Sequence, residues 1–396
     1  MGSNGLKPSL QASEAETGDT PTGSDLNPTA PHPRLAKSYH RTKLSISILS
    51  SLLAFVLLVI LIVTGVTRQL AAWSNSLASN EYIALAIFVA VLGALQSCLT
   101  LPLRWYSGFR IEHRFGLSNQ SLTRWAWEGL KAFLVGVPLM LAVLFFLYFS
   151  LETFGRMWWL PVGIVVTLLT VVLARIGPVL ILPLFYRFTP VDSGSLRERI
   201  AGLCARAGVK IDGIYSFNLS KNTSKANAAF TGIGRAKRIV LGDTLVREFT
   251  EEEIEAVFAH ELGHLAFGHI RTSILIGTVS TFVGLYVAAL LYEWSVQAAG
   301  FVSIADLAAL PILAVWLSLF ALATSPVGNL VSRRHERQAD AYAVKATGGA
   351  EAFVSALRKL GRMNLADPNP HPLIEFLLYS HPPIAKRIRA VTTGQL

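Results

Sequence analysis

The stretch FAHELGHLAFGH, residues 258–269, places two histidines and a glutamate at short spacing. On a helix, positions i and i+4 share a face, so His260 and His264 can bind one metal ion. Glu261 is turned by about 100° from His260 and can reach a water molecule at the metal as a general base. This is the H-E-x-x-H pattern of zinc peptidases. The motif alone leaves open an amphipathic helix with incidental histidines.

A catalytic zinc site needs three protein ligands and keeps one position open. In one class of zinc peptidase, the third ligand is a histidine six residues after the second, but here that position is Ile270. On a continuous helix His269 lies about 140° from the metal-binding face, so we expect a structural role for it. The third ligand must therefore come from another part of the chain.

A second candidate segment is SRRHERQADAYA, residues 332–343. Its Glu336 and Asp340 are four residues apart and share a helical face. One carboxylate could bind the metal while the other accepts the free ring N–H of a ligand histidine. His335 is an alternative ligand, and a solvated face of i,i+4 ion pairs is the alternative to any metal role.

The composition around these motifs is that of a membrane protein. The chain of 396 residues is 52% hydrophobic and 15% charged, whereas soluble domains carry about 25% charged residues. The net charge of +10 lies on residues that flank apolar runs and forms no Lys/Arg-rich patch. We therefore expect contact with membrane lipid and none with nucleic acid. Two cysteines provide no disulfide framework.

Six apolar stretches are long enough to span a bilayer, which takes about 20 residues. They lie at about 45–66, 82–103, 132–150, 157–176, 272–292 and 307–326. Lys and Arg are frequent before the first span, between the second and third, between the fourth and fifth, and after the sixth. The opposite loops contain only Arg68 and Arg156. The positive-inside rule therefore predicts that both termini and the H-E-x-x-H stretch are cytoplasmic.

The spans divide the chain into five parts. We expect a disordered tail over 1–43, a four-span region over 44–186, a first catalytic part over 187–271, a two-span region over 272–326 and a second catalytic part over 327–396. EFTEEEIEAVFAHELGHLAFGH, ending at residue 269, is predicted to be one long helix. Thr250 caps it, and Glu253 completes a capping box. Short β-like runs occur at 213–218 and 237–241. The expected fold is mainly α, a polytopic helical membrane protein with a small β-sheet in its catalytic domain.

Together these motifs resemble the type I CAAX prenyl endopeptidase family, which comprises integral membrane zinc proteases of the gluzincin type related to the bacterial membrane heat-shock proteases. H-E-L-G-H between spans, followed by S-R-x-x-E-x-x-A-D-x-x-A after the last span, is similar to the metal-binding motifs of that family. Further similar segments are FRIEHRFGLSNQS (109–121), PLFYRFTPVDSGSLRERI (183–200), NAAFTGIGRAKRIVLGDTL (227–245) and YSHPPIAKRI (379–388). The similarity covers residues 82–390.

The resemblance implies a site built around one Zn²⁺ per chain. Its ligands would be His260, His264 and Glu336, with Glu261 as the general base. By the same resemblance, Asp340 would lie behind a ligand histidine. His381 would stabilise the oxyanion, with Arg387 nearby. Asn227 and Ala228 would belong to a strand that presents its backbone to an extended peptide. The resemblance to eukaryotic members implies a design of seven spans around a chamber. Only six spans are predicted here, which leaves open how such a chamber would be closed.

The expected activity is hydrolysis of peptide bonds near the cytoplasmic membrane face, as in proteases that remove the C-terminal tripeptide next to a prenylated cysteine. No residue pattern in the sequence indicates binding of a prenyl group. Quality-control cleavage of misfolded membrane proteins, as in the heat-shock type, is therefore an alternative. A third hypothesis is a non-catalytic scaffold or transporter with a vestigial metal site. The intact general base Glu261 argues against this hypothesis. A soluble-type peptidase merely anchored by its spans is a fourth. The sequence predicts no oligomeric state.

Overall fold

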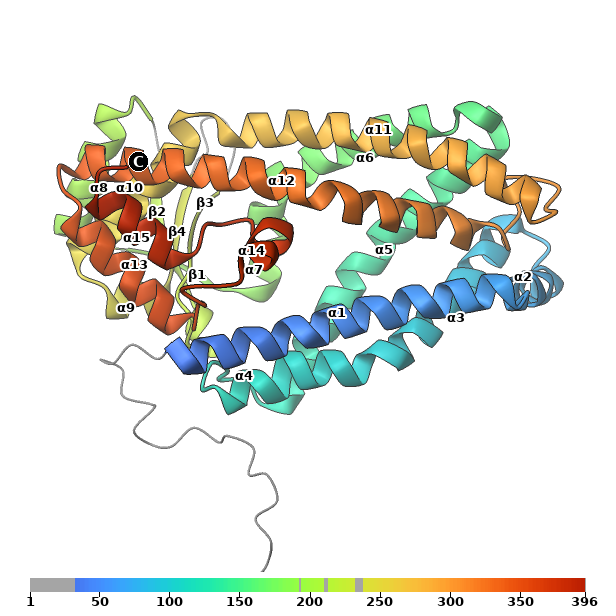
Figure 1. Ribbon diagram of the computed structural model, residues 1–396, viewed down its shortest axis with the longest axis horizontal. Coiled ribbons are helices and arrows are strands. Elements are labelled where there is room, and N and C mark those ends of the chain that lie inside the picture. Colours follow the sequence, from blue (N-terminus) through green and yellow to red (C-terminus); the bar gives the residue numbers. More distant parts are fainter. Residues whose placement is uncertain (1–32, 192–193, 210–212, 232–237, 396) are drawn as a thin grey trace, which may run out of the picture.

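The structure is a computed structural model that describes residues 33–191, 194–209, 213–231 and 238–395. Long helices run along the molecule, and a small sheet with short helices lies at one end (Figure 1). Six segments among the described residues are long and apolar enough to cross a membrane, namely Arg34–Val63, Glu81–Arg114, Leu122–Met157, Trp159–Phe185, His269–Ala298 and Leu310–Thr347. Each predicted span falls on one of these segments, so the polytopic helical prediction is confirmed.

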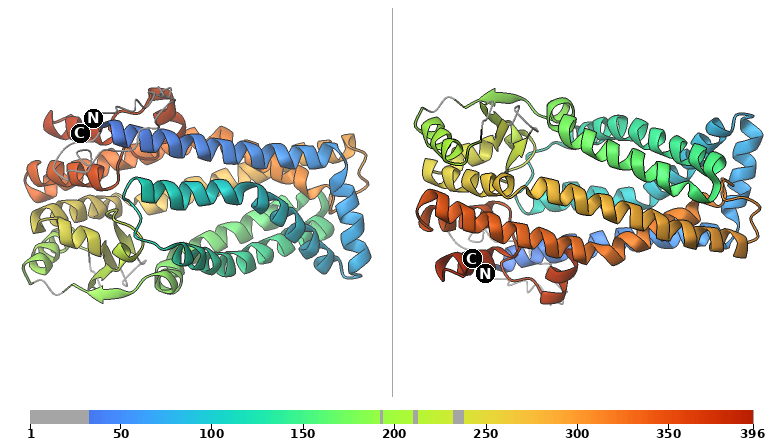
Figure 2. Two further views of the ribbon diagram at one scale, coloured as in Figure 1. Left: turned by 90° about the horizontal axis from the view of Figure 1, so that it is seen from below. Right: turned by 90° about the horizontal axis from the view of Figure 1, so that it is seen from above.

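The long helices of the membrane region follow the apolar stretches of the chain, and shorter helices connect them. They are α1 (Pro33–Val63), α2 (Val66–Leu77), α3 (Glu81–Trp105), α4 (Ile111–Arg114), α5 (Leu122–Phe154), α6 (Trp159–Ile176), α7 (Leu182–Phe185), α11 (His269–Ala298) and α12 (Leu310–Thr347). The short helix α2 was not predicted and lies across the long helices at the end opposite the sheet (Figure 2). A buried cluster that includes Phe88, Trp158 and Tyr292 packs this far end together.

The start of α1 corrects one prediction. The helix begins at Pro33, so the stretch from there to residue 43, predicted to belong to a disordered tail, is helical. The rest of the predicted tail lies outside the described residues. Ala36 and Tyr39 are buried in a small cluster with Ile111. Most helical stability comes from packing, and this contact between distant segments was not visible in the local sequence.

Within the described parts of the chain, the sheet has four strands. They are β1 (Phe188–Pro190), β2 (Gly213–Phe217), β3 (Ala228–Thr231) and β4 (Arg238–Gly242), in the order β1-β2-β4-β3. Strands β2 and β4 are parallel, and the other two pairs are antiparallel. The two predicted β-like runs correspond to β2 and β4. Strand β3 is an edge strand, pairs Ala228 with Leu241, and lies next to α10 (Glu251–Ala266).

The two predicted catalytic parts share one hydrophobic core. Besides α10, the helices of this end are α8 (Gly194–Arg206), α9 (Asp243–Glu248), α13 (Glu351–Met363), α14 (Pro372–Leu378) and α15 (Ile384–Thr392). Ile200, Leu241 and Phe258 from the first part are buried together with Phe353 and Val391 from the second. The two-span region between the parts therefore interrupts the catalytic domain in sequence and not in space.

Helix α10 starts as predicted and ends earlier than predicted. The Thr250 hydroxyl accepts from the Glu253 backbone N–H, and the Glu253 carboxylate accepts from the Thr250 N–H, which completes the capping box. The predicted helix through residue 269 is broken by Gly268, which has φ 68°. Glycine adopts this left-handed conformation at little cost. As a result His269 begins a separate helix, α11.

Candidate metal centre

The candidate centre forms where α10 packs against α12. Gly263, the glycine of HELGH, lies at this contact. A Cβ atom there would be 3.0 Å from the Ala339 Cα and 3.0 Å from the Tyr342 Cβ. Since any larger side chain would meet backbone, glycine allows the two helices to approach closely. The approach brings Glu336 of α12 to the two histidines of α10.

His260, His264 and Glu336 offer a group of ligand atoms that all lie within 4.8 Å of one another. The two histidine Nε2 atoms are 3.2 Å apart. Glu336 Oε1 is 3.3 Å from His264 Nε2, and Oε2 is 3.5 Å from His260 Nε2. The Glu336 Oε2 atom is buried and has no hydrogen-bond partner among the described residues. Apart from His260, its nearest cationic group is Arg387, whose Nη1 is 3.6 Å away. A buried carboxylate oxygen without a hydrogen bond is costly, and two imidazoles with one carboxylate are a zinc donor set, so these residues fit a divalent metal ion.

His260 is supported from behind by charged groups. Its Nδ1 lies 2.8 Å from Asp340 Oδ1, and Arg387 donates to both oxygens of that carboxylate, at 2.6 Å and 2.8 Å. Burial lowers the pKa of His260, but its hydrogen bonds to Asp340 and Glu336 outweigh burial and raise that pKa to about 9. The negative environment that favours a proton on this imidazole also favours a metal cation.

His264 is supported by a histidine that was predicted to be off the metal-binding face. The break at Gly268 places His269 Nδ1 2.9 Å from His264 Nδ1, and His269 Nε2 2.9 Å from Gln338 Oε1. The prediction of a structural role for His269 assumed a continuous helix, so it missed this contact. His335 is not in the donor group; its ring stacks on His269 at a centroid distance of 4.0 Å.

Glu261 lies at the junction of two cavities. The strand-side cavity, of about 660 Å³, is lined by Asn227, Ala228 and His381 together with the donor group. The helix-side cavity, of about 570 Å³, is lined by faces of α6, α11 and α12. Glu261 and His264 line both. Burial raises the pKa of the Glu261 carboxyl, although the nearby histidine charges oppose this, so the group is suited to accepting a proton.

The remaining predicted residues reach the same place from the C-terminal segment. His381 Nδ1 is 3.0 Å from Glu336 Oε1, and its side chain is 63% exposed, so the ring is accessible from the strand-side cavity. Arg387 follows on α15 and is almost covered. His40 of α1 also lines the strand-side cavity. Nothing in its local sequence indicated this, whereas the glycine of HELGH was a usable sign of close helix packing.

Two protein-family models match the chain, one in each half. Residues 190–394 match the family model described as peptidase family M48, and residues 31–187 match the model described as CAAX prenyl protease N-terminal, five membrane helices. The described residues of the second range contain four candidate spans and the shorter helix α2. The two matches meet close to the predicted boundary between the first four spans and the first catalytic part.

Individual relatives cover most of the chain. It is 33% identical to CAAX prenyl protease 1 of Saccharomyces cerevisiae over 77% of this chain and 71% of that protein. It is 30% identical to the uncharacterized metalloprotease YhfN of Bacillus subtilis over 90% and 84%. The crystal structure of S. mikatae Ste24p is similar with a TM-score of 0.81 and 28% identity, over 90% of this chain and 88% of that chain. The chain therefore belongs to peptidase family M48, within its CAAX prenyl endopeptidases, and is an integral membrane metalloendopeptidase.

Proposed function

We propose that this protein is a zinc-dependent endopeptidase that removes the C-terminal tripeptide next to a prenylated cysteine. The observation that carries the proposal is the donor group of buried His260 and Glu336 and half-buried His264, with Glu261 beside it at the junction of two cavities. The choice of substrate is supported by the relatives named CAAX prenyl protease 1. His/His/Glu sites accept several divalent ions, so zinc is part of the proposal.

The residues of the site have complementary roles in this proposal. Bound zinc would polarise the scissile carbonyl and acidify water. Glu261 accepts a proton from the attacking water, whose oxygen bonds to the carbonyl carbon, and returns it to the amine as the C–N bond breaks. His381 donates a hydrogen bond to the oxygen on which negative charge develops. Asp340, held by Arg387, keeps His260 oriented. Asn227 and the strand β3, which starts at Ala228, pair with an extended peptide.

We further propose that the active site faces the cytoplasm. The start of α1, α4 and the sheet lie at the same end of the molecule (Figures 1 and 2). The loops at the opposite end contain only Arg68 and Arg156 as basic residues. Because Lys and Arg concentrate on the cytoplasmic side of membrane proteins, this asymmetry supports a cytoplasmic catalytic end.

The experiment is proteolysis by the purified, detergent-solubilised full chain, with wild type compared with Glu261→Gln. A farnesylated CAAX peptide and an unfolded membrane protein are offered separately, and bound metal is measured on both proteins. We expect cleavage of the farnesylated peptide, a loss of about 10²–10⁴-fold in Glu261→Gln, and about one zinc per chain in both. Glu252→Gln is the matched control, since Glu252 is an exposed residue of the same helix.

Each other outcome changes a defined part of the proposal. Cleavage of the unfolded protein alone would transfer the function to membrane-protein quality control. Zinc without cleavage of either substrate would contradict both substrate assignments and leave the metal site. A chain that binds no zinc would contradict the metal assignment itself.

A further inference from the structure

The start of the edge strand β3 is held by a segment of the membrane region. The Thr223 hydroxyl donates to the Leu117 carbonyl at 2.6 Å, and the Ser224 hydroxyl donates to the Gly116 carbonyl at 2.9 Å. Ser118 forms an isolated bridge with Thr223. The segment before β3 is therefore attached to the turn that follows α4, more than a hundred positions earlier in the chain.

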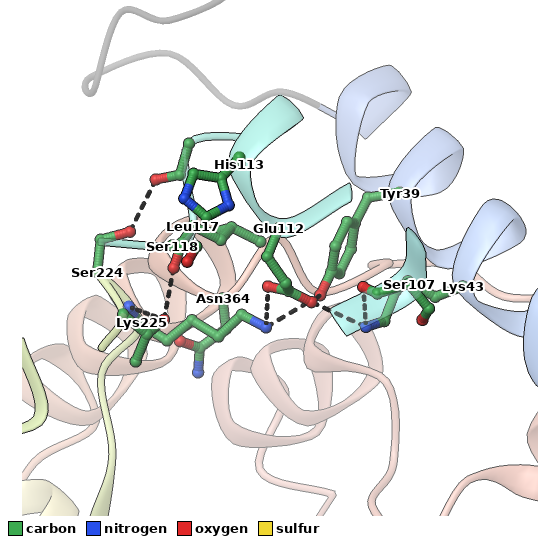
Figure 3. A network of polar contacts seen from close by, with 12 residues as sticks. Tyr39, Lys43, Ser107, Glu112, His113, Leu117, Ser118, Ser224, Lys225 and Asn364 are labelled. Carbon is green, nitrogen blue, oxygen red and sulfur yellow. Dashed lines mark hydrogen bonds and ion pairs between the residues drawn. The ribbon is translucent and has the colours of Figure 1, made fainter. Parts of the chain in front are cut away.

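Glu112 of α4 is the centre of this attachment. Its Oε1 accepts from the Tyr39 hydroxyl at 2.7 Å and from Lys43 Nζ at 2.9 Å, both on α1. Its Oε2 is 2.9 Å from Lys225 Nζ, which also donates to the Tyr39 hydroxyl at 2.9 Å. Figure 3 shows the three donors converging on the one carboxylate. The Glu112 side chain is 13% exposed, so water screens these contacts only in part.

The residues after Lys225 connect this cluster to the metal centre. Ala226 is bracketed by Asn364, which accepts from its N–H at 3.0 Å and donates to its carbonyl at 3.2 Å. Ala226, Asn227 and Ala228 all line the strand-side cavity. A shift of Lys225 would therefore move the strand relative to α10, with which it encloses the space for a peptide.

We propose that Glu112 is a positioning residue that holds the start of β3 in place at the metal centre and thereby controls peptide binding. The inference rests on the proposed function, in which β3 pairs with the substrate. It also gives a role to the segment 109–121, which the motifs of the metal site do not use. Glu112 touches neither the donor group nor the strand-side cavity, so its effect passes through Lys225.

The experiment combines two measurements on the full-length protein in detergent with zinc bound. Hydrogen–deuterium exchange followed by mass spectrometry is compared in wild type and Glu112→Gln. We expect exchange in residues 225–231 to become about tenfold faster, equivalent to about 1.4 kcal/mol of local opening free energy, and exchange in α10 to stay unchanged. For the farnesylated peptide we expect KM to rise about tenfold with kcat nearly constant, because the strand contributes uniform binding.

Two further variants identify the route of the effect. Lys225→Met should reproduce both changes, and the double variant Glu112→Gln/Lys225→Met should add little, since both residues act through one ion pair. Glu293→Gln is the matched control. It removes an ion pair with Arg156 at the far end of the molecule and should alter neither measurement.

Unchanged exchange in residues 225–231 of Glu112→Gln overturns the inference whatever the peptidase assay gives. Faster exchange throughout α10 as well would also overturn it, because that pattern indicates general destabilisation. If the wild type cleaves no peptide, the proposed function fails, while the exchange comparison still decides whether Glu112 positions β3.

Discussion

At the scale of single residues, both candidate ligand histidines are oriented through the ring nitrogen that faces away from Glu336. His260 uses Nδ1 toward Asp340, and His264 uses Nδ1 toward His269. If Nε2 of His264 binds the metal, its Nδ1 carries the proton and donates to His269 Nδ1. His269 must then carry its own proton on Nε2, where Gln338 Oε1 accepts it. Such partners fix the tautomer and direction of a ligand histidine.

This chain of hydrogen bonds predicts that the variant His269→Asn binds zinc more weakly. Without its acceptor, the His264 ring loses a fixed tautomer and orientation, and zinc affinity should fall about 10–100-fold. Competition with a zinc-chelating dye on the purified protein measures the dissociation constant. His371→Asn is a suitable control, because His371 is exposed, caps the short helix α14 and lies far from His269 in the sequence. An unchanged dissociation constant in His269→Asn would show that His269 contributes to packing and does not orient His264 for zinc binding.

At the scale of the helices, the site depends on the distance between α10 and α12. Two candidate ligands come from one helix and the third from the other, so a small separation would move Glu336 away from both histidines. Gly263 sets this distance, because the atoms that a Cβ would meet include the Ala339 backbone. Protein interiors are close-packed, and backbone atoms cannot yield as a flexible side chain can.

Gly263→Ala tests this dependence with one methyl group. Overpacking of this kind costs about 1–3 kcal/mol, so we expect a lower free energy of unfolding and weaker zinc binding together. Thermal unfolding and zinc titration measure the two effects. Gly328→Ala provides the comparison on α12, since a Cβ there meets no atom within 4 Å and alanine favours helix by about 1 kcal/mol. Equal behaviour of the two variants would show that Gly263 does not control the approach of the helices.

At the scale of the whole molecule, a metal ion would join segments far apart in sequence. The candidate ligands His260 and His264 on α10 precede the last two apolar helices, and Glu336 lies on the second of these, α12, after the predicted span 307–326. The catalytic core is likewise shared, with Phe258 before these spans and Phe353 after them. A ligand that binds only the folded arrangement stabilises it by mass action.

Removal of the metal should therefore lower thermal stability. We expect a chelator to reduce Tm and added zinc to restore it, with about 2.7 kcal/mol of stabilisation when free zinc is a hundred times its dissociation constant. Differential scanning fluorimetry in detergent follows the shift. Glu336→Gln should lose the dependence on zinc, whereas Glu293→Gln should retain it. A zinc-dependent shift that persists in Glu336→Gln would place the third ligand elsewhere.

The sequence by itself determined the features that depend on short spacing. Hydrophobic length identified the six spans, i,i+4 spacing paired His260 with His264, and the Thr250–Glu253 capping box marked the start of α10. These patterns are local, because each is decided by the geometry of one helix. The proposed third ligand, Glu336, could be selected over Asp340 or His335 only through the resemblance to a family.

The tertiary structure decided the features that depend on contacts between distant segments. One glycine conformation at Gly268 turned His269 onto His264, packing against Ile111 extended α1 back to Pro33, and Glu112 attached β3 to the membrane region. Each of these follows from a side chain that meets its partner only after the chain has folded. Local sequence propensity does not indicate such partners, because the free energy of these contacts comes from burial and pairing across the fold.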